Sequence, residues 1–206
     1  MSLVQWQGAK RLVAVPRQHR WGAIYAAEYR IRNMMKWWSA VVAYGIGHPV
    51  LYLFSIGVGV GKLIDSNAGG RGIDGVPYLT FLAPALLASA ALQGMMEEVT
   101  FPTMHGFNWR KVFYAMYATG ITGSQVAQGM MIACIARGIF STGLYWLMLL
   151  AFGAFSSPWA LLTLPVSIFA GTCFSAFMLA LSSFIRNDDN WFAIFGRFVI
   201  APMFLF

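Results

Sequence analysis

Charged residues are scarce in this sequence, at 10% of 206 residues, whereas a soluble domain carries about a quarter. Acidic residues are scarcest, with seven Asp and Glu against fourteen Lys and Arg. So little charge cannot cover a water-facing surface, and 59% of the residues are hydrophobic. The composition therefore predicts an all-α polytopic membrane protein with no separate soluble domain. The basic excess does not indicate nucleic acid, because the cations flank apolar runs, as charges that set membrane orientation do.

Residues that carry chemistry are also few. The two cysteines, Cys134 and Cys173, lie inside apolar runs and lack metal-ligand spacing. The stretch GVGVGKL at 57–63 resembles a phosphate-binding loop, but Ile56 and Leu63 replace the Gly and the Ser or Thr that such a loop needs. No nucleophile–base arrangement is present. We therefore expect no catalytic residue, no metal site and no cofactor in this chain.

Long apolar runs divide the chain into a region over 1–36 and a transmembrane domain over 37–206. A helix needs about 20 residues to cross the hydrocarbon layer. The predicted spans are 37–61, 77–98, 124–152, 158–184 and 191–206. The last run is shorter than a comfortable crossing, so we expect further sequence to follow Phe206. Ser124 is the expected N-cap of the third span, and Gly171, Ser175 and Ala176 are expected packing sites in the fourth.

The charges of the connecting segments indicate the orientation of the chain. The external loops hold only Lys62 and Arg71, within the polar turn 62–76. Ten cations fall in the segments that would then be internal: Lys10, Arg11, Arg17, Arg20, Arg30, Arg32, Lys36, Arg110, Lys111 and Arg186. Because cytoplasmic loops carry the excess of Lys and Arg, this pattern predicts a multi-pass protein of the cytoplasmic membrane with a cytoplasmic N-terminus.

The region before the first span has two parts. Residues 1–20 read as a basic tail without regular structure, and 21–38 read as an amphipathic helix. The apolar arc of this helix consists of Ile24, Ala27, Ile31, Met34, Met35 and Trp38. Its charged face consists of Glu28, Arg30, Arg32 and Lys36. A helix of this kind lies in the headgroup plane. Two interpretations stay open: a simple interfacial anchor, or an anchor whose charged face also contacts a partner.

Four ionisable residues are candidate pathway or intramembrane groups. His48 precedes Pro49 within the first span, where bonding to a neighbouring helix is the interpretation we favour over a pathway role. Glu97 and Glu98 are expected to end the second span on the inner side. Arg137 lies at mid-membrane and needs a partner if all of 124–152 is in lipid. If 124–131 projects inward instead, Arg137 extends to the inner interface, and we favour this second interpretation because 29 residues exceed what one span needs.

The segment 99–123 is the predicted internal loop between the second and third spans. It alternates aromatic and basic side chains: Trp109, Arg110, Lys111, Phe113, Tyr114 and Tyr117. This pattern predicts a short helix at the membrane surface, broken by Thr119-Gly120 and Thr122-Gly123. An exposed segment between two spans can receive force from a soluble partner and transmit it to both.

Two stretches carry a resemblance to a known family. The phrase YLTFLAPALLASAALQGMMEEVTF at 78–101 is followed by FYAMYATGITGSQVAQGMMIACIARG at 113–138. In this order they resemble the ABC-2 type permeases, the membrane subunits of ATP-driven exporters such as the nodulation lipo-oligosaccharide exporter and the daunorubicin-type drug exporters. The family often has Thr-Pro at the loop break, where this chain has Thr119-Gly120. The run 198–206 resembles the fifth of the family's six spans.

The resemblance implies a function and partners. It implies a permease that pairs with a second copy and binds two separate ATPase subunits, which hold ATP and magnesium. The 21–38 helix would be the interface helix, and 109–120 would be the coupling helix in the ATPase cleft. Cargo would be amphipathic: a lipid-linked saccharide or polysaccharide, a lipid, or a hydrophobic drug for efflux.

Two other classes of function stay open at this point. A secondary transporter or channel, not powered by an ATPase, needs ion-coupling carboxylates within the membrane, and Glu97 and Glu98 at the end of a span are poor candidates. A membrane scaffold or a membrane-embedded enzyme would bind no ATPase.

Overall fold

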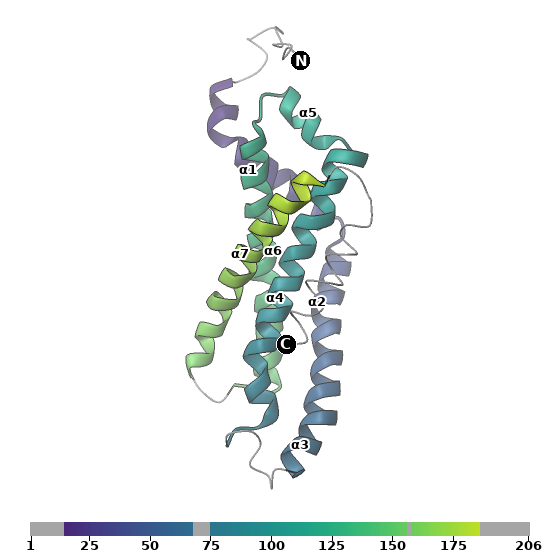
Figure 1. Ribbon diagram of the computed structural model, residues 1–206, viewed down its shortest axis with the longest axis vertical. Helices are drawn as coiled ribbons and strands as arrows, with labels where there is room; N and C mark the ends of the chain where they lie inside the picture. Colours follow the sequence, from purple (N-terminus) through teal and green to yellow (C-terminus); the bar gives the residue numbers. More distant parts are fainter. Residues whose placement is uncertain (1–14, 68–74, 156–157, 186–206) are drawn as a thin grey trace.

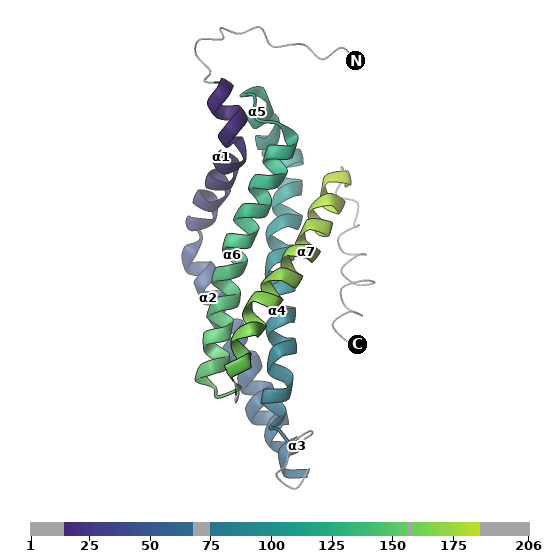
Figure 2. The same cartoon turned by 90° about the vertical axis from the view of Figure 1, so that its left-hand side faces the viewer.

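In the computed structural model the chain is an elongated bundle of helices (Figures 1 and 2). The structure describes residues 15–67, 75–155 and 158–185. Its elements, in order, are α1 (Val15–Met35), α2 (Trp38–Leu53), the π-helix η1 (Phe54–Gly61), α3 (Lys62–Asn67), α4 (Tyr78–Met104), the π-helix η2 (His105–Trp109), α5 (Val112–Ala118), α6 (Gly123–Ala151), the 3-10 helix η3 (Pro158–Leu162) and α7 (Thr163–Phe184). No strand is present in these ranges, which confirms the predicted all-helical class.

Three described helical segments are long and apolar enough to cross a membrane: Tyr78–Trp109, Gly123–Ala151 and Trp159–Phe184. The last two coincide with the third and fourth predicted spans, and the first begins with the second predicted span but extends beyond its predicted end at 98. The first predicted span, 37–61, is helical from Trp38 but is not one of these three segments. The fifth, 191–206, lies outside the described residues. Five spans are therefore not confirmed.

The two ends of the bundle differ in what they carry. One end holds the beginning of α1, the end of α4, all of α5, the beginning of α6 and the end of α7 (Figures 1 and 2). The opposite end holds α3 and the beginning of α4. The predicted polar turn 62–76 is thus wrong at its start, because Lys62–Asn67 continues the helix of α2 and η1 as α3.

Helix α1 begins earlier than expected, and small residues form its contact with α6. It starts at Val15, because a proline in the first turn of a helix does not remove a hydrogen bond that the helix would otherwise make. The predicted unstructured tail over 1–20 is therefore wrong for its last residues. Ala26 and Ala27 are buried, whereas Ile24 and Met35 of the expected apolar arc are exposed. Small side chains face inward because α1 packs closely along α6.

Helix α1 approaches α6 closely at Gly129. A Cβ atom there would lie 2.5 Å from the Cβ of Ala26 and 2.7 Å from the carbonyl oxygen of Ala23. We expect Gly129→Ala to lower stability by about 1–3 kcal/mol, because one of these contacts is backbone and cannot rotate away. Thermal unfolding in detergent measures this. Gly143→Ala in the same helix is the control, since nothing lies within 4 Å of its added Cβ; equal melting points would contradict the close packing.

At the centre of the bundle α4 packs between α6 and α7 through Met95. Its side chain is fully buried. A Cβ at Gly138 of α6 or at Gly171 of α7 would lie 2.6 Å from its sulfur, so both glycines leave room for one thioether. Of the other predicted packing sites in α7, Ser175 is buried and Ala176 is exposed, so the second prediction is wrong.

Candidate functional site

Glu98 is the centre of an ion-pair network that joins three helices. Its carboxylate, in α4, is 1% exposed. Arg30 of α1 donates from Nε to Glu98 Oε1 at 2.6 Å, and a second nitrogen, Nη2, lies 2.5 Å from the same oxygen. Arg137 of α6 forms an ion pair with the other oxygen, Oε2. A buried carboxylate is stable only when its charge is compensated in this way.

This network corrects the predicted end of the second span. Helix α4 does not stop at Glu97-Glu98 but continues to Met104 and then, as η2, to Trp109. Glu98 can stay buried in the helix because two distant arginines neutralise it. Arg137 accordingly has the partner that the mid-membrane interpretation required. Its side chain is 22% exposed.

The other members of the predicted charged face lie away from this network. Glu28 and Arg32 form an i, i+4 ion pair at 2.5 Å whose side chains are well exposed. Exposed pairs of this kind contribute little to stability. Lys36 is exposed at the end of α1. Of the four residues, Arg30 is the one that the described ion pairs join to α4.

A small cavity of about 70 Å³ is lined in part by Arg137. Glu97 and Gln93 of α4 line it, together with Thr142 of α6. The Thr142 hydroxyl is buried and has no hydrogen-bond partner. The side chain of His48, another predicted polar group of the spans, lies outside the described residues. The structure thus separates Glu97 from Glu98, as their 100° offset on a helix requires.

A folded elbow, defined as residues 105–122, connects α4 to α6. After η2 the chain reverses at Lys111, which has a positive φ of 51°. Helix α5 follows and ends where Gly120 adopts a φ of 89°, a conformation that glycine adopts at little cost. The predicted short helix and the predicted break at Thr119-Gly120 are confirmed.

The start of α6 shows a signal that the sequence analysis missed. The N-cap is Thr122, not the predicted Ser124. Gln125 donates its backbone N–H to the Thr122 hydroxyl at 3.4 Å, and its side-chain oxygen accepts from the Thr122 N–H at 3.0 Å. This is a capping box, which the sequence Thr-x-x-Gln encodes. It fixes the point where the elbow joins α6.

The aromatic residues of the elbow divide into an inner and an outer set. Phe113 packs edge-on against Phe107 at 4.8 Å between ring centroids. It also covers Gly106, where any Cβ would collide with its ring. Trp109, Tyr114 and Tyr117 are 56%, 61% and 64% exposed. Phe113 is therefore an anchor of the elbow, and the outer three are available to a partner.

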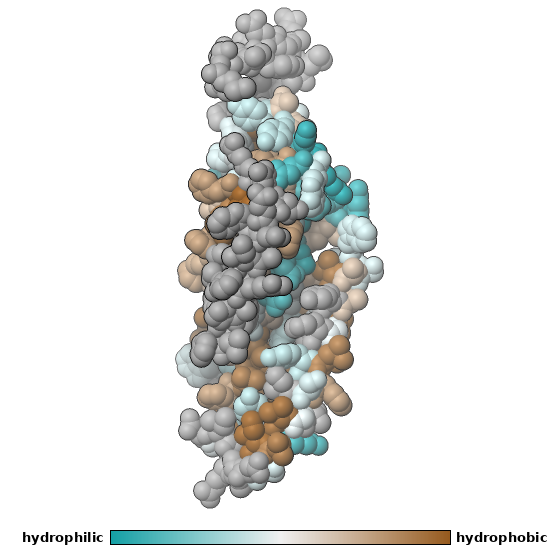
Figure 3. Space-filling view, turned by 45° about the vertical axis from the view of Figure 1, so that its right-hand side comes forward, coloured by the Kyte–Doolittle hydropathy of each residue, from teal (hydrophilic) through white to brown (hydrophobic). Residues whose placement is uncertain are grey.

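Arg110 and Lys111 are exposed beside these aromatic side chains. On the face shown in Figure 3, hydrophilic residues gather mainly toward the end that carries α5. The predicted coupling residues thus lie at one end of the molecule, on the elbow, and Arg30, Glu98 and Arg137 lie along the helices that meet there. No local sequence pattern links Arg30 to this set, because it is 68 residues from Glu98.

Comparisons with known proteins confirm the resemblance noted above. The chain is 26% identical over 197 residues to nodulation protein J of Sinorhizobium fredii, covering 94% of this chain and 71% of that protein. It is 28% identical over 186 residues to nodulation protein J of Rhizobium leguminosarum bv. viciae, covering 84% and 65%. Nodulation protein J of Azorhizobium caulinodans is 26% identical over 187 residues, covering 89% and 68%.

The chain thus spans about two thirds of the length of these relatives. No protein-family model matches it. No solved structure matches it either.

Proposed function

We propose that this chain, a relative of the nodulation J proteins, is the membrane-spanning permease subunit of an ATP-driven ABC exporter. It moves an amphipathic molecule, such as a lipid-linked saccharide, a lipid or a hydrophobic drug, across the cytoplasmic membrane. The long apolar helices and the similarity to nodulation protein J support the membrane and transport parts of this proposal. The exposed aromatic elbow between α4 and α6 is the observation that supports coupling to a motor protein.

In this proposal the chain itself does no chemistry. Two ATPase subunits hold ATP and magnesium, and a second permease copy completes the transporter. The N-terminus and the elbow face the cytoplasm, where Trp109, Tyr114 and Tyr117 enter the ATPase cleft. Exposed aromatic side chains beside Arg110 and Lys111 are the residue types that dominate protein interfaces.

The Glu98 network gives a physical route for the force. When ATP closes the motor pair, the elbow moves and displaces the ends of α4 and α6. Because Glu98 binds Arg30 and Arg137 at once, α1 moves with them rather than remaining in place. The three helices then tilt as one unit and open a path between the two permease copies.

Photocrosslinking from the elbow tests this function. With p-benzoylphenylalanine in place of Tyr117, we expect irradiated membranes of the native host to give an adduct with a nucleotide-binding protein. The matched control carries the same group at Phe81, an exposed residue near the opposite end of α4. If both positions gave only lipid adducts, an ATPase partner at the elbow would be excluded.

A secondary transporter is the alternative, and one observation favours it. Glu97 lines a small cavity between α2, α4 and α6, where a coupling ion could bind. That function predicts transport that persists after ATP depletion and stops when the ion gradient is dissipated. The permease proposal predicts the reverse.

A further inference from the structure

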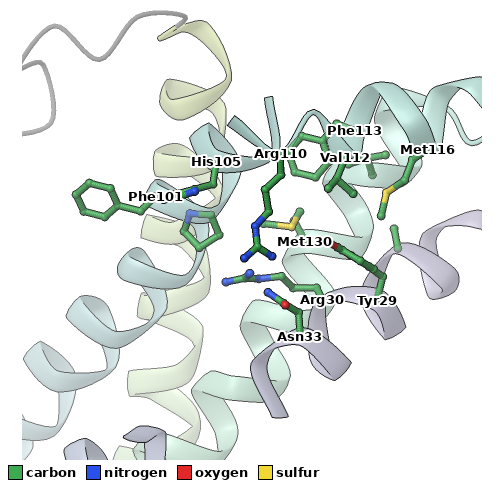
Figure 4. A pocket seen from close by; sticks show the side chains of 14 residues that line it. Tyr29, Arg30, Asn33, Phe101, His105, Arg110, Val112, Phe113, Met116 and Met130 are labelled. Carbon is green, nitrogen blue, oxygen red and sulfur yellow. The ribbon is translucent and has the colours of Figure 1, made fainter. Parts of the chain in front are cut away.

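A cationic cleft lies between α1, η2, α5 and α6, close to the elbow. Its volume is about 290 Å³. Tyr29, Arg30 and Asn33 of α1 form one wall, with His105 and Arg110 opposite. Figure 4 shows the guanidinium groups of Arg30 and Arg110 reaching into the same space, with the amide of Asn33 beside them.

The charge of this cleft is not balanced by the residues that line it. None of the lining residues is acidic. Glu98 already binds Arg30 and Arg137, and Glu28 is paired with Arg32. Within the described ranges Arg110 has no ion-pair partner. Two cations that share a cavity repel each other, so an anion between them would lower the energy of the folded chain.

The shape of the site indicates what kind of anion fits. The remaining lining of the cleft is apolar and includes Phe101, Phe113 and Met130. Phe113, Val126 and Met130 also line a wider apolar groove of about 740 Å³ between α5, α6 and α7. A cationic cleft and an apolar groove thus share one wall. A molecule with an anionic head and an apolar chain is complementary to both.

We propose that the cleft binds the phosphate group of an anionic membrane lipid, with Arg30 and Arg110 as its two cationic ligands. The guanidinium fork matches phosphate oxygens, and basic pockets between membrane helices are suited to lipid headgroups. The acyl chain lies along the shared wall of Phe113, Val126 and Met130. This requires only that the elbow end of the bundle meets a bilayer surface, and it does not depend on transport or on an ATPase.

The test measures lipid-dependent stabilisation of the purified full chain in detergent. Phosphatidylglycerol, phosphatidylcholine with the same acyl chains, and inorganic phosphate alone are each added before thermal unfolding. We expect phosphatidylglycerol to raise the melting temperature and the other two to have little effect. An equal shift with inorganic phosphate would overturn the lipid assignment, and equal shifts with both lipids would overturn the anion site.

Three substitutions distinguish binding at this site from a non-specific effect of surface charge. Arg110→Gln should weaken the stabilisation by phosphatidylglycerol about tenfold. Lys111→Gln removes the same charge from a neighbouring residue that does not line the cleft, so this variant should keep the full stabilisation. Asn33→Asp places a carboxylate beside the arginines. It should abolish the lipid effect while raising the melting temperature of the lipid-free chain. An unchanged lipid preference in Arg110→Gln or Asn33→Asp would overturn the proposal.

Discussion

Replacing Glu98 with glutamine is expected to lower the melting temperature of the bundle by about 10 °C. Two arginines from different helices would lose their common counterion while remaining largely buried, at 17% and 22% exposure. Breaking a buried ion pair by removing one partner costs about 3–5 kcal/mol, because the remaining charge is left uncompensated. In a chain of this size, a loss of that magnitude corresponds to the expected fall in melting temperature.

Thermal unfolding in detergent, followed by circular dichroism, measures this effect. Glu97→Gln is the matched control, because it removes the same charge one residue earlier from a half-buried side chain that belongs to no ion pair among the described residues. Arg30→Gln combined with Glu98→Gln should recover part of the loss, since one uncompensated cation is removed. If Glu98→Gln melted within about 2 °C of Glu97→Gln, the network would not stabilise the fold.

The second large effect is expected at the outer face of the elbow. Tyr114→Ala with Tyr117→Ala should reduce ATP-driven transport at least tenfold while basal ATP hydrolysis by the complex continues. Both side chains are more than 60% exposed, so their loss leaves no cavity in the bundle. Buried aromatic anchors carry a large share of interface energy, and two of them would be missing from the proposed contact.

Reconstituted vesicles that contain the permease and its ATPase permit both measurements on one sample. Phe81→Ala is the control, an exposed aromatic residue far from the elbow, and it should transport normally. Normal transport by the tyrosine double variant, at equal protein level, would show that the elbow does not couple the two subunits. Loss of ATP hydrolysis together with transport would indicate failed assembly, which co-purification of the ATPase detects.

The sequence predicts best what depends on local pattern. It places the third span at 124–152, and α6 runs from Gly123 to Ala151, because a long apolar run and a glycine-rich break mark both ends. The short helix of the elbow follows from alternating aromatic and basic residues. The N-cap at Thr122 differs from the predicted Ser124, although Thr-x-x-Gln encodes it.

What the sequence does not predict depends on contacts between distant residues. Two neighbouring glutamates at the end of an apolar run normally mark the membrane edge, so the predicted second span ends before α4 does. Only the approach of Arg30 and Arg137 makes Glu98 compatible with burial, and that approach rests on the small residues Ala26 and Gly129 at the α1–α6 contact. The contact of α1 with α6 was not predicted for the same reason, since alanines rather than larger side chains permit it.

The packing of Met95 between two glycines has a consequence for redox chemistry. Its sulfur is shielded from water while α4, α6 and α7 stay together. Oxidants can therefore reach it only when these helices separate, and the sulfoxide formed then would be too polar and too bulky to return between Gly138 and Gly171. The rate at which peroxide modifies this one methionine would thus report how often the centre of the bundle opens.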